Sequence, residues 1–278
     1  MQHIEDIEYP RGPSIFNVFV SYFSRTALTY RVITNNDHFN SYLRLSEKVN
    51  SCPLGEDPRP FVTSYGRFIL SQRVVTTFED MHQNIINYDT GEVIRYIVDE
   101  PNFNYGKNWT PFVYNNSVFF IHCFDPFTVI HNGRIIIKIP TNIDKCGHDN
   151  FTAFRGGSNG IIYNQDSDII YGIGHYTIKL ENHNPFIWVL NLKKNTLEIA
   201  LLSDYIARYI IADPTGLWQE DGETYLSMFE SSKGWFHTDA TCVSRIFRID
   251  FPQLYTKMKM ERSYKIIAIN LDPIRKEM

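Results

Sequence analysis

The stretch Gly55-Glu56-Asp57-Pro58-Arg59-Pro60-Phe61 runs directly into the alternating apolar segment Val62–Leu70. Proline fixes its own φ angle and pushes the residue before it, here Asp57, toward an extended backbone. The stretch therefore predicts a carboxylate held at the entrance of a β-strand, with Arg59 two residues further along the same face. A cation at that position could tune the pKa of the carboxyl group. A solvated turn with one surface ion pair explains the same four residues equally well.

Short strands are expected along the whole chain. Apolar or alternating runs of about 5–8 residues, rich in Ile, Val, Phe and Tyr, recur with turn sequences such as Asn115-Asn116 and Asn132-Gly133 between them. Helical segments are few, and 40–49 and 202–211 are the two candidates, although the second could equally be extended. A strand-dominated chain of this length is expected to close into a sandwich, a barrel or a propeller.

Five polar segments favour the propeller. Each is followed by strand, turn and strand, and they start roughly 45–60 residues apart, the length of one four-stranded blade. They are Pro13-Ser14-Ile15, Asp57-Pro58-Arg59, Trp109-Thr110-Pro111-Phe112, Arg155-Gly156-Gly157-Ser158 and Asp213-Pro214-Thr215-Gly216. We therefore predict an all-β, five-bladed β-propeller in which residues 1–278 form a single domain. Because the innermost strands of a propeller begin around its central channel, these polar segments should share one cavity.

The composition restricts the partners. The chain has 27 basic and 31 acidic residues, a formal net charge of −4, which argues against a nucleic-acid surface built on bulk charge. No apolar run approaches the roughly 20 residues that span a bilayer, and Met1–Asp6 lacks the apolar core of a signal peptide. The four cysteines show no metal-type spacing and are interpreted as reduced thiols. We expect a cytoplasmic protein without membrane or nucleic-acid partners, and the oligomeric state stays open.

Four motifs in order give a resemblance to a known family. They are Glu56-Asp57-Pro58-Arg59, Gly106–Phe112 (GKNWTPF), Phe154-Arg155-Gly156-Gly157-Ser158 and the strand Ile170–His175. In this order and spacing they resemble glycoside hydrolase family 130 and its relatives, over about Pro13 to Ile249. The resemblance implies a five-bladed β-propeller that acts on glycosidic bonds, typically of β-mannosides. That family includes phosphorolytic and hydrolytic members, and related β-1,2-mannosyltransferases.

The chain also departs from the family pattern. His122–Phe127 stands where relatives often carry a proline-histidine pair, and Ser158-Asn159 replaces the usual threonine-proline. No cluster of arginines and lysines matches the phosphate site of the phosphorylases. Hydrolysis and sugar transfer are therefore left more open than phosphorolysis.

The resemblance implies that Asp57 is the general acid of an inverting mechanism and donates its proton through a hydroxyl of the bound sugar. Arginine forks, an amide and an indole are groups that suit a sugar, and inversion needs a second carboxylate, for which Asp125 and Asp239 are candidates. The residues expected to bind substrate are Glu56, Arg59, Lys107, Asn108, Trp109, Asp125, Arg155, His175 and Asp239.

Most of these residues also have a structural explanation. Trp109 could be a core ring between two blades, and His175 a hydrogen-bonded core histidine. Asp125 and Asp239 could be turn residues. The loop 144–149 carries potential metal ligands but lacks the second half of a site. No metal and no organic cofactor are expected.

These observations predict a carbohydrate-active enzyme that cleaves or transfers a glycosyl group, of a β-mannoside by the resemblance, in an axial pocket. Its substrate would be a glycan, a sugar phosphate or a nucleotide sugar. Two alternatives stay open. A nucleotide-sugar-dependent glycosyltransferase would need a further subsite for the base and diphosphate. A non-catalytic glycan-binding propeller would keep the ring and amide contacts without needing the acid.

Overall fold

A computed structural model describes residues 1–7, 15–34, 42–44, 52–53, 55–73, 82–103, 108–143, 153–164, 167–178, 182–203, 205, 207–233 and 241–276. Within these ranges nearly all regular structure is β-strand, which confirms the all-β prediction. The exceptions are the 3-10 helix η3 (Pro101–Phe103) and the α-helices α1 (Phe251–Met258) and α2 (Asp272–Lys276). Neither α-helix is long and apolar enough to cross a membrane.

The structure describes parts of both candidate helices, and neither part is helical. Within 202–211 the described residues form turns and bends, and Ile211 already begins strand β19. The other candidate, 40–49, falls mostly outside the described residues, and its described part, Tyr42–Arg44, is strand β4.

The described strands form five antiparallel sheets. Each of the first three is built from consecutive strands. The first contains β2 (Ile15–Ser24), β3 (Ala27–Thr34), β4 (Tyr42–Arg44) and β5 (Cys52–Pro53). The second contains β6 (Glu56–Thr63), β7 (Gly66–Arg73), β8 (His82–Asn87) and β9 (Val93–Tyr96). The third contains β10 (Thr110–Tyr114), β11 (Ser117–Phe124), β12 (Phe127–His131) and β13 (Arg134–Ile139).

The last two sheets combine strands from distant parts of the chain. The fourth contains β14 (Ala153–Arg155), β16 (Ile169–Ile178), β17 (Asn182–Asn191), β18 (Thr196–Leu201) and β22 (Lys265–Ala268), and β15 (Ile161–Ile162) pairs with β16. The fifth contains β19 (Ile211–Glu220), β20 (Glu223–Ser231), β21 (Cys242–Ile249) and β1 (Gln2–Ile7). Because β1 pairs with β21, the beginning of the chain completes a sheet made of later strands.

Predicted hairpin turns join neighbouring strands. Asn115 and Asn116 connect β10 to β11 with φ angles of 48° and 62°, and Asn132 and Gly133 connect β12 to β13 with φ angles of 47° and 75°. Two consecutive positive φ angles are typical of the type I′ turn, whose twist matches that of the flanking strands. The asparagine and glycine residues at these positions therefore explain the short hairpins.

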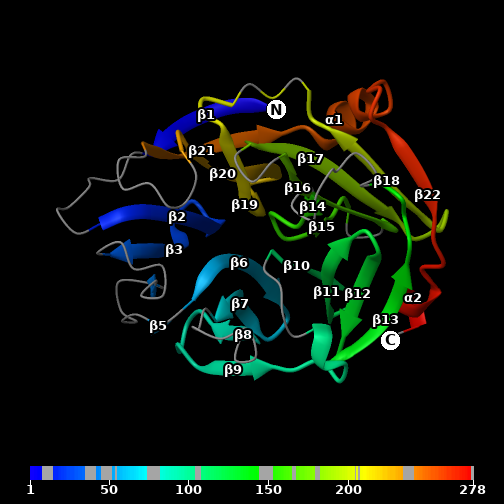
Figure 1. The fold of residues 1–278 in the computed structure, drawn as a ribbon, viewed down its shortest axis with the longest axis horizontal. Helices are drawn as coiled ribbons and strands as arrows, with labels where there is room; N and C mark the ends of the chain where they lie inside the picture. The colour runs from blue at the N-terminus through cyan, green and yellow to red at the C-terminus, as the bar shows by residue number, and fades with distance from the viewer. Residues whose placement is uncertain are drawn as a thin grey trace.

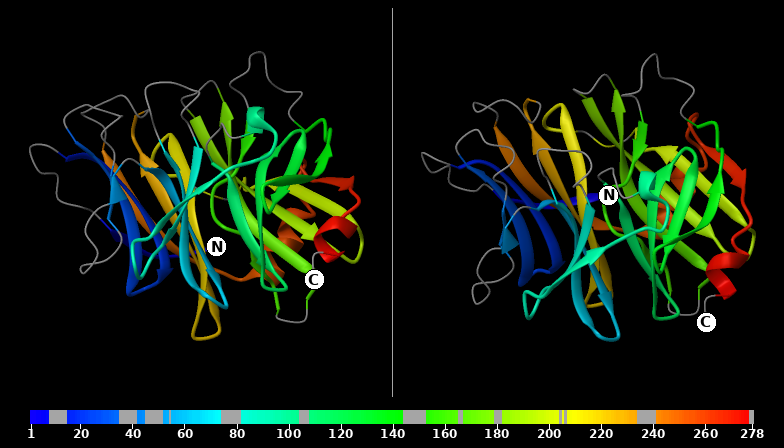
Figure 2. Two further views of the ribbon diagram at one scale, coloured as in Figure 1. Left: turned by 90° about the horizontal axis from the view of Figure 1, so that it is seen from below. Right: turned by 60° about the horizontal axis from the view of Figure 1, so that its bottom comes forward.

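The sheets have a propeller-like arrangement around a common centre (Figure 1). Strand β2 contacts β6, β6 contacts β10, and β19 contacts both β2 and β16. Gly160, just before β15, donates a backbone hydrogen bond to Pro111 in β10, which connects the third sheet to the fourth. The side views in Figure 2 show β22 and α2 on the outer edge of the molecule, away from this centre.

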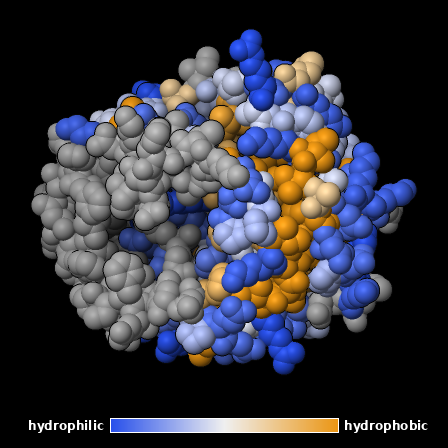
Figure 3. Space-filling view, turned by 45° about the vertical axis from the view of Figure 1, so that its right-hand side comes forward, coloured by the Kyte–Doolittle hydropathy of each residue, from blue (hydrophilic) through white to orange (hydrophobic). Residues whose placement is uncertain are grey.

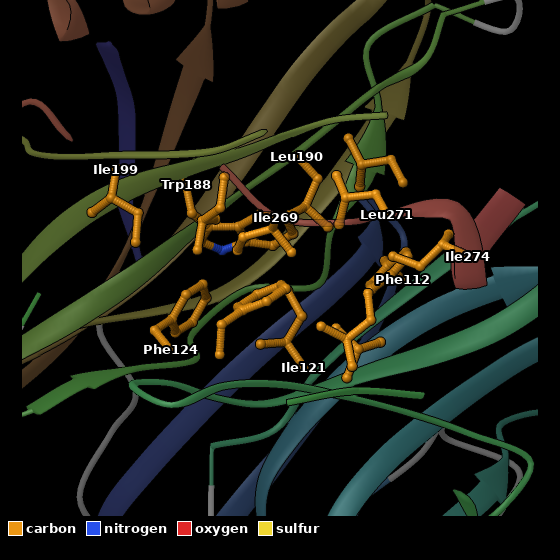
Figure 4. Close-up of a cluster of buried hydrophobic side chains, with 14 of the residues drawn as sticks. Phe112, Ile121, Phe124, Trp188, Leu190, Ile199, Ile269, Leu271 and Ile274 are labelled. Atoms are coloured by element: carbon orange, nitrogen blue, oxygen red, sulfur yellow. The ribbon is translucent and has the colours of Figure 1, made fainter. Parts of the chain in front are cut away.

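The apolar cores lie between neighbouring sheets. The largest cluster fills the space between the third and fourth sheets, where rings such as Phe112, Phe124 and Trp188 meet Ile269 and Leu271 from the end of the chain (Figure 4). The C-terminal segment therefore covers one side of this core. A strip of hydrophobic residues faces outward on the side of β22, where Ile266 is exposed (Figure 3).

Candidate functional site

Asp57 lies in a β-bulge near the start of β6. The register of β6 against β7 shifts between Glu56 and Arg59, and Asp57 has a φ angle of 50°. The prediction of an extended backbone at this residue is therefore wrong. Aspartate is one of the few residues other than glycine that tolerate this left-handed conformation, and the bulge re-aims its side chain.

The carboxylate of Asp57 is paired with Arg31 of β3 rather than with Arg59. Arg31 Nη1 donates to Asp57 Oδ1 at 2.7 Å, and both side chains are buried. A guanidinium group at this distance favours the ionised carboxylate. The surface ion pair that was the alternative explanation of this stretch is therefore excluded, because the pair is internal.

Arg59 connects three segments of the chain. Its Nη1 donates to the backbone oxygen of Pro214 at 2.8 Å and its Nη2 to Asn108 Oδ1 at 3.0 Å. The guanidinium groups of Arg59 and Arg31 lie 5.1 and 5.2 Å from the ring centre of Phe19. The two arginines are therefore held beside one aromatic ring that stabilises both cations.

A second carboxylate, Asp213, lies at the start of β19 with two histidines beside it. His183 Nδ1 lies 2.6 Å from Asp213 Oδ1, at hydrogen-bond distance, and His175 Nδ1 lies 3.6 Å from the same oxygen. The two imidazole rings stack with their centres 4.8 Å apart. All three side chains are buried. Among the described residues, neither ring nitrogen of His175 has a hydrogen-bond partner.

Burial and neighbouring charges set the protonation of these groups. Burial lowers the pKa of His175 to about 3, against the opposing charge of Asp213, so the ring is neutral at pH 7. Burial alone would raise the pKa of Asp213, but His183 and the charge of Arg59 outweigh it and hold that pKa below its ordinary value. Burial also lowers the pKa of Arg59, while Asp57 and Asp213 oppose the shift. Arg59 stays charged because guanidinium starts from so high a pKa.

Arg155 reaches the same region through the Arg-Gly-Gly segment. It lies opposite His175 in the pairing of β14 with β16, and its charge contributes to lowering the pKa of His175. A Cβ atom at Gly156 would lie 1.9 Å from the backbone oxygen of Asn108. Only glycine permits this approach of two chain segments, which explains the glycine beside Arg155.

The structure thus brings eight polar residues together, and we call them the central cluster. They are Arg31, Asp57, Arg59, Asn108, Arg155, His175, His183 and Asp213. Five of them, Asp57, Arg59, Asn108, Arg155 and His175, are residues singled out from the sequence.

Other sequence candidates lie elsewhere. Trp109 is buried in an apolar core and its ring packs against Tyr96 and Phe120, so the structure places it as a core ring rather than in the cluster. Asp125 lies in the hairpin between β11 and β12, where its Oδ1 accepts hydrogen bonds from the backbone of Thr141 and Asn142. That contact is the turn role considered as the alternative, so Asp125 is not the second carboxylate of the cluster.

Three candidates are placed less fully. Glu56 is half-buried next to Asp57, and its backbone oxygen accepts a hydrogen bond from Ser71. Lys107 and Asp239 lie outside the described residues. The loop 144–149, which was considered for metal binding, also lies entirely outside the described residues.

Arg31, His183 and Asp213 are cluster residues that were not among the expected substrate-binding residues, although Asp213 begins one of the five polar segments predicted to share a cavity. A signal for Asp213 existed, because Asp213-Pro214 repeats the Asp57-Pro58 pair at the equivalent point of another polar segment. Arg31 is a charged residue within the apolar run Leu28–Ile33, a pattern that predicts a buried and paired charge. His183 carries no comparable signal.

His175, His183 and Asp213 also have the donor set of a metal site. Their ligand atoms all lie within 4.8 Å of one another, and a neutral imidazole with an ionised carboxylate suits a divalent cation. However, the charges of Arg59 and Arg155 act on the same groups, and they would repel a dication. The arrangement therefore favours a neutral or anionic ligand, and the absence of a metal requirement stays a prediction.

Comparisons with known proteins show the fold and leave the family open. No protein-family model matches the chain, and no curated protein matches it. Among solved structures, the chain is similar to a hypothetical protein from Leishmania major, with a TM-score of 0.55, 15% identity and coverage of 96% of this chain and 94% of that chain. A subtype N10 neuraminidase-like protein of A/little yellow-shouldered bat/Guatemala matches with a TM-score of 0.38, 8% identity and coverage of 89% and 99%. A match at that TM-score carries no argument about function.

Proposed function

We propose that the central cluster binds a carbohydrate and that the protein cleaves or transfers a glycosyl group there. The observation that supports the proposal is the convergence of two carboxylates, three guanidinium groups, an amide and two imidazoles from distant parts of the chain. Such a set offers donors and acceptors in several directions, as the hydroxyl groups of a sugar require. The choice of a β-mannoside rests on the motif resemblance to glycoside hydrolase family 130.

We also propose that each of the five sheets is one blade of a five-bladed propeller. The contacts between innermost strands support this, as does the pairing of β1 with β21, which joins the two ends of the ring. The cluster would then lie where the innermost strands begin.

In the proposed mechanism Asp57 is the acid and Asp213 the opposing carboxylate. The bond between the anomeric carbon and the leaving oxygen breaks as that oxygen takes a proton from Asp57, through a sugar hydroxyl. The attacking water or acceptor hydroxyl bonds to the anomeric carbon from the opposite face and loses its proton to Asp213. Because its pKa is held low, Asp213 is ionised at neutral pH, so its carboxylate is available to accept that proton. Asp57 must first gain a proton, so the bound sugar has to weaken its pairing with Arg31.

The test is an activity screen of the purified protein with nitrophenyl mannosides, mannose-1-phosphate and GDP-mannose, alone and with acceptor sugars. Replacing the proton donor by Asp57→Asn should lower turnover by on the order of 10²–10⁴-fold and leave glycan binding measurable. Asp89→Asn is the control, because Asp89 is exposed and pairs with Arg67. No turnover of any of these compounds by the unaltered protein would overturn the enzymatic proposal.

A glycan-binding protein without catalysis is the second candidate. The observation that favours it is the buried ion pair between Arg31 and Asp57, because an ionised carboxylate cannot donate a proton. In that case calorimetry should detect mannoside binding while the activity screen stays negative. Turnover of GDP-mannose alone would instead support the nucleotide-sugar alternative.

A further inference from the structure

A cavity of about 560 Å³ lies at the opposite end of the innermost strands from the central cluster. Asp57 and Asp213 lie near the starts of β6 and β19, whereas the cavity is lined by residues near the ends of the same strands, such as Phe61 and Trp218. Residues of β2, the β10–β11 turn and β15 complete its wall. The cavity is thus built from all five sheets.

The described part of the lining of this cavity carries no charged side chain. Of the described residues that line it, none is Asp, Glu, Lys, Arg or His. Buried rings, Tyr22, Phe61 and Trp218 among them, form its inner part. Exposed carboxamides of Asn116 and Gln219 lie at its outer part. An apolar interior with a few polar groups at the edge is typical of sites for small molecules, and the volume falls in the usual range of roughly 300–1,000 Å³.

Direct contacts between the innermost strands separate the cavity from the central cluster. Ser21 Oγ donates to the backbone oxygen of Pro58 at 2.6 Å, which ties β2 to β6. The side chain of Asn159 bonds both backbone groups of Leu217, at 3.0 and 2.8 Å. A Cβ atom at Gly216 would lie 3.0 Å from the ring of Pro60. These close contacts lie between the two ends of the strands, so the cavity is a site of its own.

We propose that this cavity binds a small neutral molecule with a flat, mostly apolar body and one hydroxyl or amide group. The rings and aliphatic side chains would bury the apolar body, and the carboxamides at the edge would bond the polar group. A charged ligand is disfavoured because none of the described lining side chains can neutralise its charge. This site does not depend on the proposed sugar chemistry of the central cluster.

Two fluorescent probes with the same ring system test the charge preference. N-phenyl-1-naphthylamine is neutral, and 8-anilino-1-naphthalenesulfonate carries an added sulfonate. Titrated into the intact protein, the neutral probe should bind saturably at one site, and its affinity should exceed that of the sulfonate by about tenfold or more. The absence of saturable binding of the neutral probe, or equal affinities of the two probes, would overturn the proposal.

Matched variants locate the binding. Val62 lines the cavity and is 56% exposed, whereas Val93 is 45% exposed on β9 and does not line it. Val62→Trp places a large ring at the cavity edge and should weaken binding of the neutral probe about tenfold or more, whereas Val93→Trp should change it by less than about twofold. Equal effects of the two tryptophan variants would contradict a separate site here.

Discussion

Arg31 and Asp57 form a buried ion pair, whereas Arg67 and Asp89 form an exposed one. Removing one partner of a buried pair leaves a charge without compensation, which costs about 3–5 kcal/mol. An exposed pair contributes about 0–1 kcal/mol. We therefore expect Arg31→Met to decrease the free energy of unfolding by several times as much as Arg67→Met does. Urea denaturation of both variants measures the two decreases. Similar losses in the two variants would show that Asp57 is solvated rather than buried.

The pKa of His175 predicts a pH dependence of stability. Its value in the folded protein is about 3, below the ordinary 6.5, so between these values the unfolded chain binds more protons than the folded one. Stability should therefore fall as the pH decreases from 6.5, by up to about 1.4 kcal/mol per pH unit from this group. Above pH 6.5 this contribution fades to zero over about one pH unit. The measurement is urea denaturation at a series of pH values between 7 and 4.

One variant identifies the residue responsible. His175→Asn should reduce the slope between pH 6.5 and about 5. Asp213 has a lowered pKa and therefore removes stability only as the pH falls below about 5, so the comparison is made above that pH. An unchanged slope in His175→Asn would contradict the buried, neutral state of the ring.

Single residues were predictable where a local motif marked them, and not where a distant partner decided their role. Asp57 and Arg59 stand out in a short polar stretch, and both belong to the cluster. Their charges interact, as expected from their spacing, but the direct ion-pair partner of Asp57 is Arg31, which comes from another strand. Trp109 shows the same limit, since a tryptophan next to polar residues can equally enter a core.

Close packing between elements predicts the effect of a change at Gly156. Its added Cβ would lie 1.9 Å from the oxygen of Asn108 and 2.4 Å from Thr110 Oγ1, so one of the two segments must move. Gly156→Ala should destabilise the protein by about 1–3 kcal/mol or more. Gly222→Ala is the control. No atom lies within 4 Å of its added Cβ, so this variant shows only the backbone strain of alanine at a φ angle of 77°. A smaller loss at Gly156 than at Gly222, measured by thermal unfolding, would contradict this packing.

Elements were predictable from alternation and turn residues, because both are local properties. The hairpin turn at Asn115 and Asn116 is an example, since asparagine tolerates the positive φ angles found there. The pairings of β1 with β21 and of β22 with β18 could not be predicted. They join segments far apart in the chain, and no local pattern specifies the partner of an edge strand.

The joining of distant segments predicts how the whole molecule unfolds. If residues 1–278 form one domain, closed by β1 against β21, calorimetry should show a single transition whose calorimetric and van't Hoff enthalpies agree. Two separate transitions would show that the sheets unfold independently and would contradict a single closed domain.

The most direct test of a sugar site at the centre of the molecule is a crystal structure of the protein with a bound β-mannoside. We predict that the sugar contacts both Asp57 and Asp213 within hydrogen-bond distance, with Arg59 and His175 on its sides. A sugar bound only elsewhere on the protein, with the central cluster unchanged from its ligand-free geometry, would contradict the account.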